Sequence, residues 1–294
     1  MAEHQRLVLL VNPSAGAGRA KALLPEAERL LDQHGLEHRV VMTEGLEYGR
    51  QQAIAAADAG EVPVVVSGDG LIGQVGGALA GRDVAMGVIP GGRGNDFARI
   101  AGIPTDVGEA VAALAAGVTR EIDVGEIDGV RFLCVASCGL DSDANRIANE
   151  AKLVRGNLVY VYAALRALVA WKPACFTLDL DGRRREVRGY SVAVANSRAY
   201  GGGMLIAPDA ELDDGLLDVV TSGHVSKLRA LANLPKVFKG THVDEPHVTV
   251  EQAAEVRIEA DRPFTVYADG DPVAELPATV RLLRRALRVI VAAQ

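Results

Sequence analysis

The chain has 294 residues, carries a formal net charge of −7 and contains only 4% aromatic residues. The negative charge disfavours non-specific binding to nucleic acid, and the shortage of aromatic side chains argues against a surface on which bases stack. With 49% hydrophobic and 23% charged residues, a chain of this length is typical of a globular protein with two domains rather than one.

The sequence suggests neither a secretory signal nor a membrane span. Its N-terminus lacks a basic region followed by an apolar stretch. The longest apolar run, Leu158 to Trp171, is shorter than the roughly 20 residues needed to cross a bilayer. Three cysteines, Cys134, Cys138 and Cys175, lie in apolar sequence without the spacing of metal ligands. They indicate buried, reduced thiols and a cytoplasmic protein.

The first 120 residues alternate apolar strand patterns with helical patterns, which favours a doubly wound parallel sheet. Strands are predicted at residues 6–11, 38–43, 64–66 and 84–89. Helices are predicted at residues 19–34, 47–59 and 71–79.

Three of these strands run directly into loops that contain glycine: Asn12 to Gly18, Ser67 to Gly70 and Pro90 to Arg99. In a parallel sheet the three loops share one edge, where free amide groups and helix N-termini attract phosphate. Asp69 lies within the second loop, where it could hold a metal ion or accept a proton. Gly-Asp-Gly is also a common tight turn, so that loop alone does not define a site.

After Val118 the pattern changes to short alternating strands. Asp128-Gly129 and Asp181-Gly182 each interrupt an alternating run and predict β-hairpins. More alternating strands are expected over residues 248–268, and helices over residues 157–171 and 226–239. These features predict a mainly antiparallel β domain that begins near Arg120.

The C-terminal run, residues 280–293, is apolar with four arginines. It could return to pack on the first domain, or it could lie on an anionic membrane surface. We expect packing, because charged faces are usually only solvated. The predicted domains are therefore residues 1–120 with 280–294, and residues 121–279.

Four motifs in order resemble the diacylglycerol kinase catalytic family, which includes bacterial soluble lipid kinases and the sphingosine and ceramide kinases. Asn12 to Gly18 matches Asn-Pro-x-x-Gly-x-Gly, and Ser67 to Leu71 matches Gly-Gly-Asp-Gly-Thr. Pro90 to Ala98 is similar to Pro-x-Gly-Thr-x-Asn-Asp-Phe-Ala. Gly201 to Leu217 is similar to the family's later Gly-Gly-Gly and Asp-Gly-x-Leu run.

The resemblance implies an NAD kinase/phosphofructokinase-like nucleotide-binding α/β domain followed by a β-sandwich domain that takes the lipid, with ATP and the lipid hydroxyl in a cleft between them. It implies an ATP-dependent kinase that phosphorylates the primary hydroxyl of a lipid such as diacylglycerol or another lipid alcohol. Mg²⁺ would be a cofactor. Such a protein would be cytoplasmic and peripheral at the inner membrane face, with transient contact to the membrane surface. The resemblance leaves open whether the protein forms a homodimer.

The resemblance also assigns residues. Asp69 and Asp271 are its two candidates for catalysis, the latter in an Asp-Gly-Asp turn where bacterial members have Asp-Gly-Glu. The candidates for nucleotide binding are Asn12, Pro13, Ser14, Ala15, Gly16, Thr43, Gly68, Asp69, Gly70, Leu71, Ile72, Gly73, Gln74, Arg93 and Asn95. The candidates for magnesium are Glu211, Asp214 and Leu216, of which Asp214 would give its side chain and the others backbone carbonyls. Without the resemblance, Asp213-Asp214-Gly215 reads equally well as a β-turn.

Two positions depart from the family pattern. Leu71 replaces a Thr whose hydroxyl can donate to phosphate, and Arg93 replaces a Thr or Ser. Arg93 could pair with phosphate oxygens or could close the site. Two alternatives stay open. One is an NAD kinase-like enzyme with a soluble substrate, which shares the Gly-Asp-Gly turn; the other is a non-catalytic nucleotide or lipid sensor, which the changes at Leu71 and Arg93 would favour. For a lipid acceptor, residues 153–171 are the candidates to cover its chains, and ordinary core is the alternative.

Overall fold

The computed structural model describes residues 6–150 and 158–293. It divides into two compact units, Met1–Val124 with Arg284–Gln294, and Gly125–Leu283. Each unit has its own buried apolar core. The chain therefore starts and ends in the first unit, and the second unit is inserted between two of its strands.

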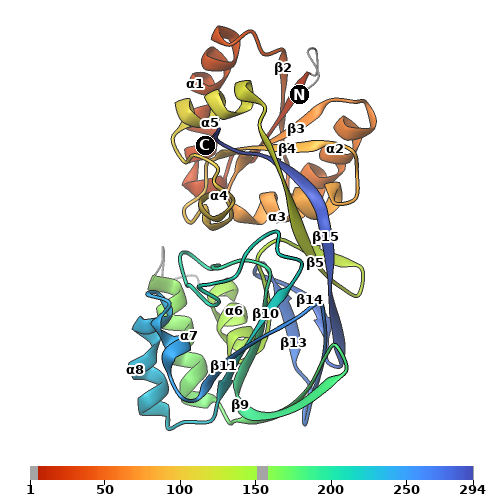
Figure 1. Cartoon of the computed structure of the whole chain (residues 1–294). Helices are drawn as coiled ribbons and strands as arrows, with labels where there is room; N and C mark the ends of the chain where they lie inside the picture. The colour runs from red at the N-terminus through yellow and green to blue at the C-terminus, as the bar shows by residue number, and fades with distance from the viewer. Residues whose placement is uncertain (1–5, 151–157, 294) are drawn as a thin grey trace. The chain divides into compact units, whose positions relative to one another are not determined.

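A parallel sheet forms the centre of the first unit (Figure 1). Its strand order is β2 (His38–Met42), β1 (Leu7–Val11), β3 (Val62–Ser67), β4 (Ala85–Pro90) and the end of β15 (Ala278–Ile290). Every residue of β1 and β3 is buried. Strands covered on both faces are expected to be continuously apolar, and both are, except for Ser67 at the end of β3.

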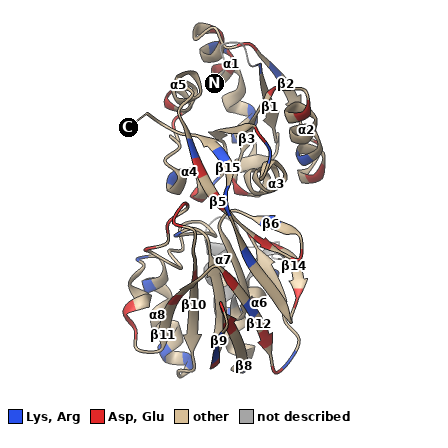
Figure 2. Ribbon diagram, turned by 45° about the vertical axis from the view of Figure 1, so that its right-hand side comes forward, with Lys and Arg blue, Asp and Glu red and all other residues tan. Residues whose placement is uncertain are grey.

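Helices cover both faces of this sheet. The helices α1 (Arg19–Gln33) and α5 (Val107–Ala116) lie on one side, and α2 (Leu46–Asp58) and α3 (Asp69–Leu79) on the other (Figure 2). Alternate residues of the strands point to each side, so that Leu7, Leu9 and Val11 join the core beneath α1. The doubly wound α/β fold predicted from the sequence is confirmed.

The C-terminal run is a strand rather than a helix. Its end joins the first unit's sheet beside β4, where Arg288 pairs with Ala85 and Val289 with Met86 in parallel register. Val289 is fully buried, so this edge of the sheet is completed by the end of the chain.

The second unit is an antiparallel β-sandwich, as predicted. One layer contains β7 (Val135–Gly139), β13 (Thr265–Ala268), β14 (Asp271–Glu275), β10 (Leu217–Gly223) and β11 (Val248–Ala253). The other contains β8 (Ala174–Leu180), β12 (Glu255–Ala260), the start of β15, β5 (Thr119–Ile127) and β6 (Val130–Phe132).

The long strand β9 (Arg183–Ala195) belongs to both layers. Its first half pairs with β8, and its second half lies between β7 and β10. The predicted hairpins are confirmed, because Asp128-Gly129 joins β5 to β6 and Asp181-Gly182 joins β8 to β9. Both aspartates adopt positive φ angles, as this type of turn requires.

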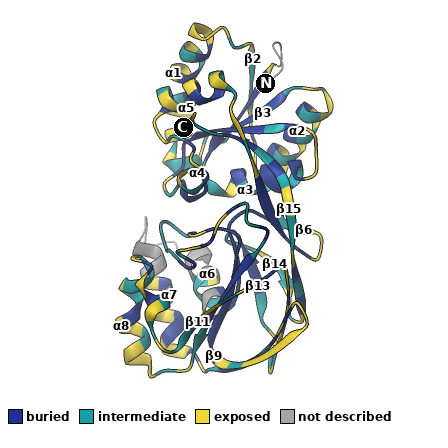
Figure 3. Cartoon of the chain, viewed as in Figure 1, coloured by how far each residue is buried: buried dark blue, intermediate teal, exposed yellow. Residues whose placement is uncertain are grey.

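Three helices accompany the sandwich: α6 (Leu140–Glu150), α7 (Leu158–Ala170) and α8 (Lys227–Val237). The last two were expected and the first was not. The inner face of α7 is buried through Leu168 and, just beyond the helix, Trp171, which pack with Tyr190 (Figure 3). Among the described helices, none combines the length and the hydropathy that a membrane crossing requires.

One expectation about the cysteines is wrong. Cys134 and Cys138 are buried free thiols, but Cys175 is exposed. Cys175 lies in β8, whose residues alternate between buried and exposed positions. Its apolar neighbours in sequence point into the core, whereas its own side chain points outward.

Candidate functional site

The three glycine-bearing loops of the first unit touch one another. A Cβ atom on Gly16 would lie 2.3 Å from the carbonyl oxygen of Gly91, and one on Gly92 would lie 2.5 Å from the Cα of Gly68. The loops that follow β1, β3 and β4 therefore approach so closely that only glycine fits between their backbones. The predicted convergence of these loops on one sheet edge is confirmed.

Hydrogen bonds hold the three loops in this arrangement. The Gly91 amide donates to the Ser67 carbonyl at 2.7 Å, and the Asn12 amide donates to the Val66 carbonyl at 3.3 Å. Buried Asn95, which has a φ of +53°, accepts the Gly92 amide at 2.9 Å through its Oδ1 atom. Asn95 is thus a support for the loop after β4.

Thr43 supports the first loop from β2. Its amide and its hydroxyl both donate to the Val11 carbonyl, at 2.8 and 3.2 Å, immediately before Asn12. The Oδ1 atom of Asn12 in turn accepts the amide and the hydroxyl of Ser14. The candidate residues of this loop are therefore ordered by hydrogen bonds within the loop and by the contact of Thr43 with the end of β1.

Asp69 lies where the second and third loops meet. Its Oδ1 atom accepts the Phe97 amide at 3.1 Å. Its Oδ2 atom lies 3.1 Å from the position that a Cβ on Gly94 would occupy. Burial raises the pKa of this carboxyl, and the nearby charge of Asp96 adds to the effect, while the Phe97 hydrogen bond opposes it. A carboxylate with a raised pKa is a better proton acceptor than an ordinary one.

The helices that begin at this edge lack side-chain caps. Gly18 precedes α1 and Gly68 precedes α3, and neither helix start has a side-chain hydrogen bond to its first amides. By contrast, Asp106 caps α5 and Ser226 caps α8. The first amides of α1 and α3 have no partner within their helices, so this edge offers donors to an anion.

The other candidates on α3 divide by burial. Leu71 is 1% exposed and packs beside Thr43 and Gly49, between α2 and α3. Ile72 is fully buried and its amide donates to the Gly68 carbonyl. Their side chains are thus part of the core, which explains an apolar Leu71 where the family has Thr. Gly70, Gly73 and Gln74 are at least partly exposed, and Arg93 is exposed in the loop after β4.

The Asp269-Gly270-Asp271 turn joins β13 to β14 in the second unit. Asp269 accepts three backbone amides, from Leu133 at 2.8 Å, Cys134 at 2.9 Å and Val135 at 3.1 Å. Its carboxylate therefore ties the turn to the start of β7. Asp271, the catalytic candidate, is half-buried two residues later. The sequence could not distinguish these two roles, because hydrogen-bond partners more than 130 residues away define the first.

The predicted magnesium ligands lie in the segment that precedes β10. Asp214 accepts the Leu216 amide at 2.9 Å, and Glu211 is exposed. Nearby Asp218 is buried, and its pKa is raised to about 6 by burial and by the charges of Asp214 and Asp209. This oxygen-rich, negatively charged surrounding fits a hard cation. No three His, Cys, Asp or Glu side chains are grouped for a metal within residues 6–150 and 158–293.

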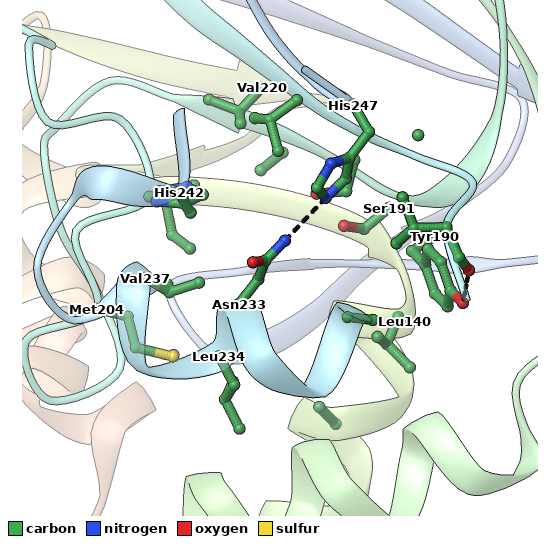
Figure 4. A pocket seen from close by; sticks show the side chains of 18 of the residues that line it. Leu140, Tyr190, Ser191, Met204, Val220, Asn233, Leu234, Val237, His242 and His247 are labelled. Carbon is green, nitrogen blue, oxygen red and sulfur yellow. Dashed lines mark hydrogen bonds between the residues drawn. The ribbon is translucent and has the colours of Figure 1, made fainter. Parts of the chain in front are cut away.

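A cavity of about 160 Å³ lies within the second unit (Figure 4). Apolar side chains from α6, α8, β9 and β10 form most of its wall, among them Leu140, Ala193, Val220, Leu234 and Val237. A concave, mainly apolar cavity with a few polar groups is the usual form of a site for an apolar ligand.

Polar side chains also line the cavity, among them Asn233, His242 and His247. Asn233 donates to His247 Nε2 at 3.0 Å. His242 is 5% exposed, and neither of its ring nitrogens has a hydrogen-bond partner of good geometry among the described residues. Burial lowers the pKa of both imidazoles, so they are neutral at pH 7. Sequence analysis missed these residues, because isolated histidines carry no motif.

Among its described side chains, the apolar segment predicted to cover lipid chains contributes none to the wall of this cavity. Residues 153–157, its first part, lie outside the described residues. The described side chains of α7 are absent from the cavity wall, which α6 and α8 provide instead. Leu168 and Trp171 serve as core beside it.

Comparisons with known proteins extend over both units. Residues 6–127 match the family model described as the diacylglycerol kinase catalytic domain. Residues 134–291 match the model described as the YegS C-terminal NAD kinase beta sandwich-like domain. A diacylglycerol kinase of Mycobacterium tuberculosis is 35% identical over 293 residues, covering 97% of this chain and 94% of the relative. One of Bacillus subtilis is 27% identical, covering 97% and 96%.

The fold is also similar to that of a solved structure of a diacylglycerol kinase from Bacillus anthracis. The TM-score is 0.78 at 21% identity, with 99% of this chain and 98% of that chain covered. At 21% identity the structural match shows a shared fold, whereas the sequence matches, which extend over nearly the whole chain, show the family. The chain belongs to the diacylglycerol kinase family.

Proposed function

We propose that this protein is an ATP-dependent lipid kinase that phosphorylates the primary hydroxyl of a lipid alcohol, with diacylglycerol the first candidate. The observation that carries the proposal is the contact of three glycine-bearing loops around Asp69 at one sheet edge. Membership of the diacylglycerol kinase family supports the reaction class.

The nucleotide phosphates would bind to the loops after β1 and β3. The uncapped starts of α1 and α3 supply amide donors and the positive ends of two helix dipoles. Arg93, which is exposed beside them and has no ion pair within the described part of the chain, would add a guanidinium for phosphate oxygens. This arrangement positions a triphosphate and offsets its charge, which phosphoryl transfer mainly requires.

The proton of the acceptor hydroxyl would pass to a carboxylate as the hydroxyl oxygen attacks the γ-phosphorus and ADP leaves. Asp69 is our first candidate for this general base, because it is half-buried beside the proposed phosphate site and its pKa is raised. Asp271 is the second candidate, since it occupies the position of the family's Glu.

Magnesium would be held by the Asp214 carboxylate with the carbonyls of Glu211 and Leu216. The Asp214 side chain already accepts the Leu216 amide, so the turn is ordered without the ion. A bound cation would offset the negative charges of Asp214, Asp209 and Asp218 and would stabilise this segment.

The cavity of the second unit would hold the apolar part of the lipid. Its wall is mostly aliphatic, and the ring of His242, whose nitrogens have no hydrogen-bond partner of good geometry among the described residues, could form a hydrogen bond with a ligand oxygen. The second unit would thus select the acceptor, while the first binds the nucleotide.

The test is a transfer assay with radiolabelled Mg-ATP over several lipid classes and NAD. The lipids are a diacylglycerol, a monoacylglycerol, a sphingoid base and a ceramide, each dispersed in detergent micelles. We expect label in at least one lipid and none in NAD, and loss of this label in the Asp69→Asn protein.

Two outcomes would overturn the proposal. Label in NAD alone would mean a kinase for a soluble substrate. ATP binding without transfer to any lipid class would mean a protein that senses the nucleotide.

A further inference from the structure

The two most exposed large apolar side chains of the described residues lie next to each other. Val169, at the end of α7, is 78% exposed, and Leu228, at the start of α8, is 81% exposed. The end of α7 and the start of α8 meet here, since Lys227 Nζ donates to the Val169 carbonyl at 2.6 Å. Two neighbouring aliphatic side chains that are this exposed need an explanation other than the core.

More exposed apolar residues extend this surface along both helices. Tyr162 and Leu165 lie on α7, and Leu231 lies on α8, each more than one third exposed. The helices pack against each other and are drawn side by side in Figures 1 and 3. We call the surface formed by these five residues the α7–α8 face.

The charged residues of the two helices themselves are all basic. Neither α7 nor α8 contains an acidic residue, although the whole chain has a net charge of −7. Arg166, Lys172 and Lys227 are exposed and have no acidic partner within the described part of the chain. Basic residues lie along the lower helices in Figure 2. Arg229 and Lys236 also lie on α8, where Glu245 pairs with both.

The outward residues are not needed to fold α8. Its other face already contributes Ala230, Asn233, Leu234 and Val237 to the cavity wall. Leu228 therefore lies on the side of α8 opposite these residues, and Leu231 lies at the edge between the two sides. Their apolar side chains are exposed and are available for contact with another surface.

We propose that the α7–α8 face docks on the surface of an anionic lipid bilayer. Exposed aliphatic and tyrosine side chains would enter the interface, and the flanking cations would contact acidic headgroups. A second copy of this chain fits less well, because a two-fold contact would place the same cations opposite each other. This inference rests on the proposed lipid-kinase function, because a lipid substrate resides in a bilayer and the enzyme must reach it there.

The test is flotation of the full chain with large unilamellar vesicles, in the absence of ATP. One set contains phosphatidylcholine alone and the other contains phosphatidylcholine with phosphatidylglycerol. We expect binding to the anionic vesicles, at least about tenfold above binding to the neutral ones, and weaker binding as salt is raised.

An apolar and a cationic double variant separate the two contributions. Val169→Ser/Leu228→Ser should lower binding at least about tenfold. Its matched control is Val118→Ser/Val250→Ser, which removes similarly aliphatic exposed residues elsewhere. Lys172→Gln/Lys227→Gln should lower binding about fivefold for each lysine. Its matched control is Lys21→Gln/Arg29→Gln on α1, where both residues are exposed.

The proposal is overturned if the protein ignores anionic vesicles, or if either test variant binds as tightly as its control. Transfer to a lipid in detergent micelles is then measured separately for the same variants. Vesicle binding without transfer would refute the kinase function and support the docking face. Transfer without vesicle binding would support the kinase function and refute the docking face. Size-exclusion chromatography gives the oligomeric state. A dimer that Val169→Ser/Leu228→Ser converts to a monomer would show that the face serves self-association and would refute docking on a bilayer.

Discussion

At the scale of single residues, Asp69 lies at the proposed phosphate site, and its buried carboxylate lowers the stability of the folded state. Burial raises the pKa of its carboxyl above the ordinary value of 3.8. A carboxyl with a raised folded pKa stabilises the fold below its unfolded pKa, and this contribution is lost as pH rises through the folded pKa. The ionised Asp69, our proposed proton acceptor, therefore destabilises the fold at pH 7.

We predict opposite effects of Asp69→Asn on activity and stability. Turnover should fall about 10²-fold or more, because the base is gone. The melting temperature at pH 7 should stay the same or rise, because a buried charge is removed and Asn Oδ1 still accepts the Phe97 amide. Transfer assays and thermal unfolding measure both. A variant with normal turnover would exclude Asp69 as the base.

The same carboxyl predicts a pH dependence. If Asp69 is the base, transfer by the native enzyme should decline as pH falls through its raised pKa, and the acid limb should lie above pH 3.8. The profile of turnover against pH measures this limb. An enzyme with constant turnover down to the ordinary carboxyl range would contradict the raised pKa or the role.

Asp269 and Asp271 allow a matched comparison. Asp269→Asn should lower the free energy of unfolding by about 2 kcal/mol, because one side-chain oxygen that accepts backbone amides is replaced by a donor. Asp271→Asn should change it by less than about 1 kcal/mol. If Asp271 is catalytic, that second variant should lose turnover. Denaturant unfolding and the transfer assay distinguish the two roles, and equal losses of stability would remove the distinction.

At the scale of elements, the proposed nucleotide site depends on loops that pack backbone against backbone. Gly16, Gly68, Gly91 and Gly92 each lie where an added Cβ would come within 3.0 Å of another loop or of α1. Sequence patterns located the strands and the glycines, because both are local. Only the contacts between loops show which glycines are required by close approach and which serve as flexible turns.

Gly92→Ala tests this packing. Its Cβ would lie 2.5 Å from the Gly68 Cα and 2.7 Å from Asn95 Oδ1, and overpacking of this kind costs about 1–3 kcal/mol. We expect weaker ATP binding in calorimetry and a lower melting temperature. Gly45→Ala, where nothing lies within 4 Å of the added atom, is the control. Unchanged ATP affinity in Gly92→Ala would show that the loop geometry does not support the nucleotide.

At the scale of the whole molecule, the order of the chain makes the first unit depend on its last residues. Leu287, Val289 and Ile290 are each at most 1% exposed. The Gly81 amide donates to the Ala286 carbonyl, and the Val291 amide donates to the Val118 carbonyl. The C-terminal run, which we expected to pack on the first domain rather than on a membrane surface, is thus an integral strand of the parallel sheet.

Truncation after Leu283 should therefore unfold the first unit. It removes the end of β15, exposes the edge of β4 and opens the core. We expect aggregation on expression or complete loss of ATP binding. Truncation after Ala292 is the control, because it spares every strand residue. A soluble protein that ends at Leu283 and binds ATP would show that the returning strand is dispensable.

The sequence by itself determined the features that depend on neighbours along the chain. These are the alternation of strands and helices, the hairpins at Asp128 and Asp181, the glycine-bearing loops and the family motifs. Local periodicity and turn chemistry are sufficient for such features.

Only the tertiary structure decided the features that depend on burial and on distant partners. Asp269 and Asp271 occupy one turn, and only the folded chain shows that the amides of Leu133, Cys134 and Val135 donate to the Asp269 carboxylate. In the same way, the fold buries Leu71 and encloses His242, while Leu228 remains outside. An apolar residue can belong to a core or to a docking face, and its environment in three dimensions distinguishes the two.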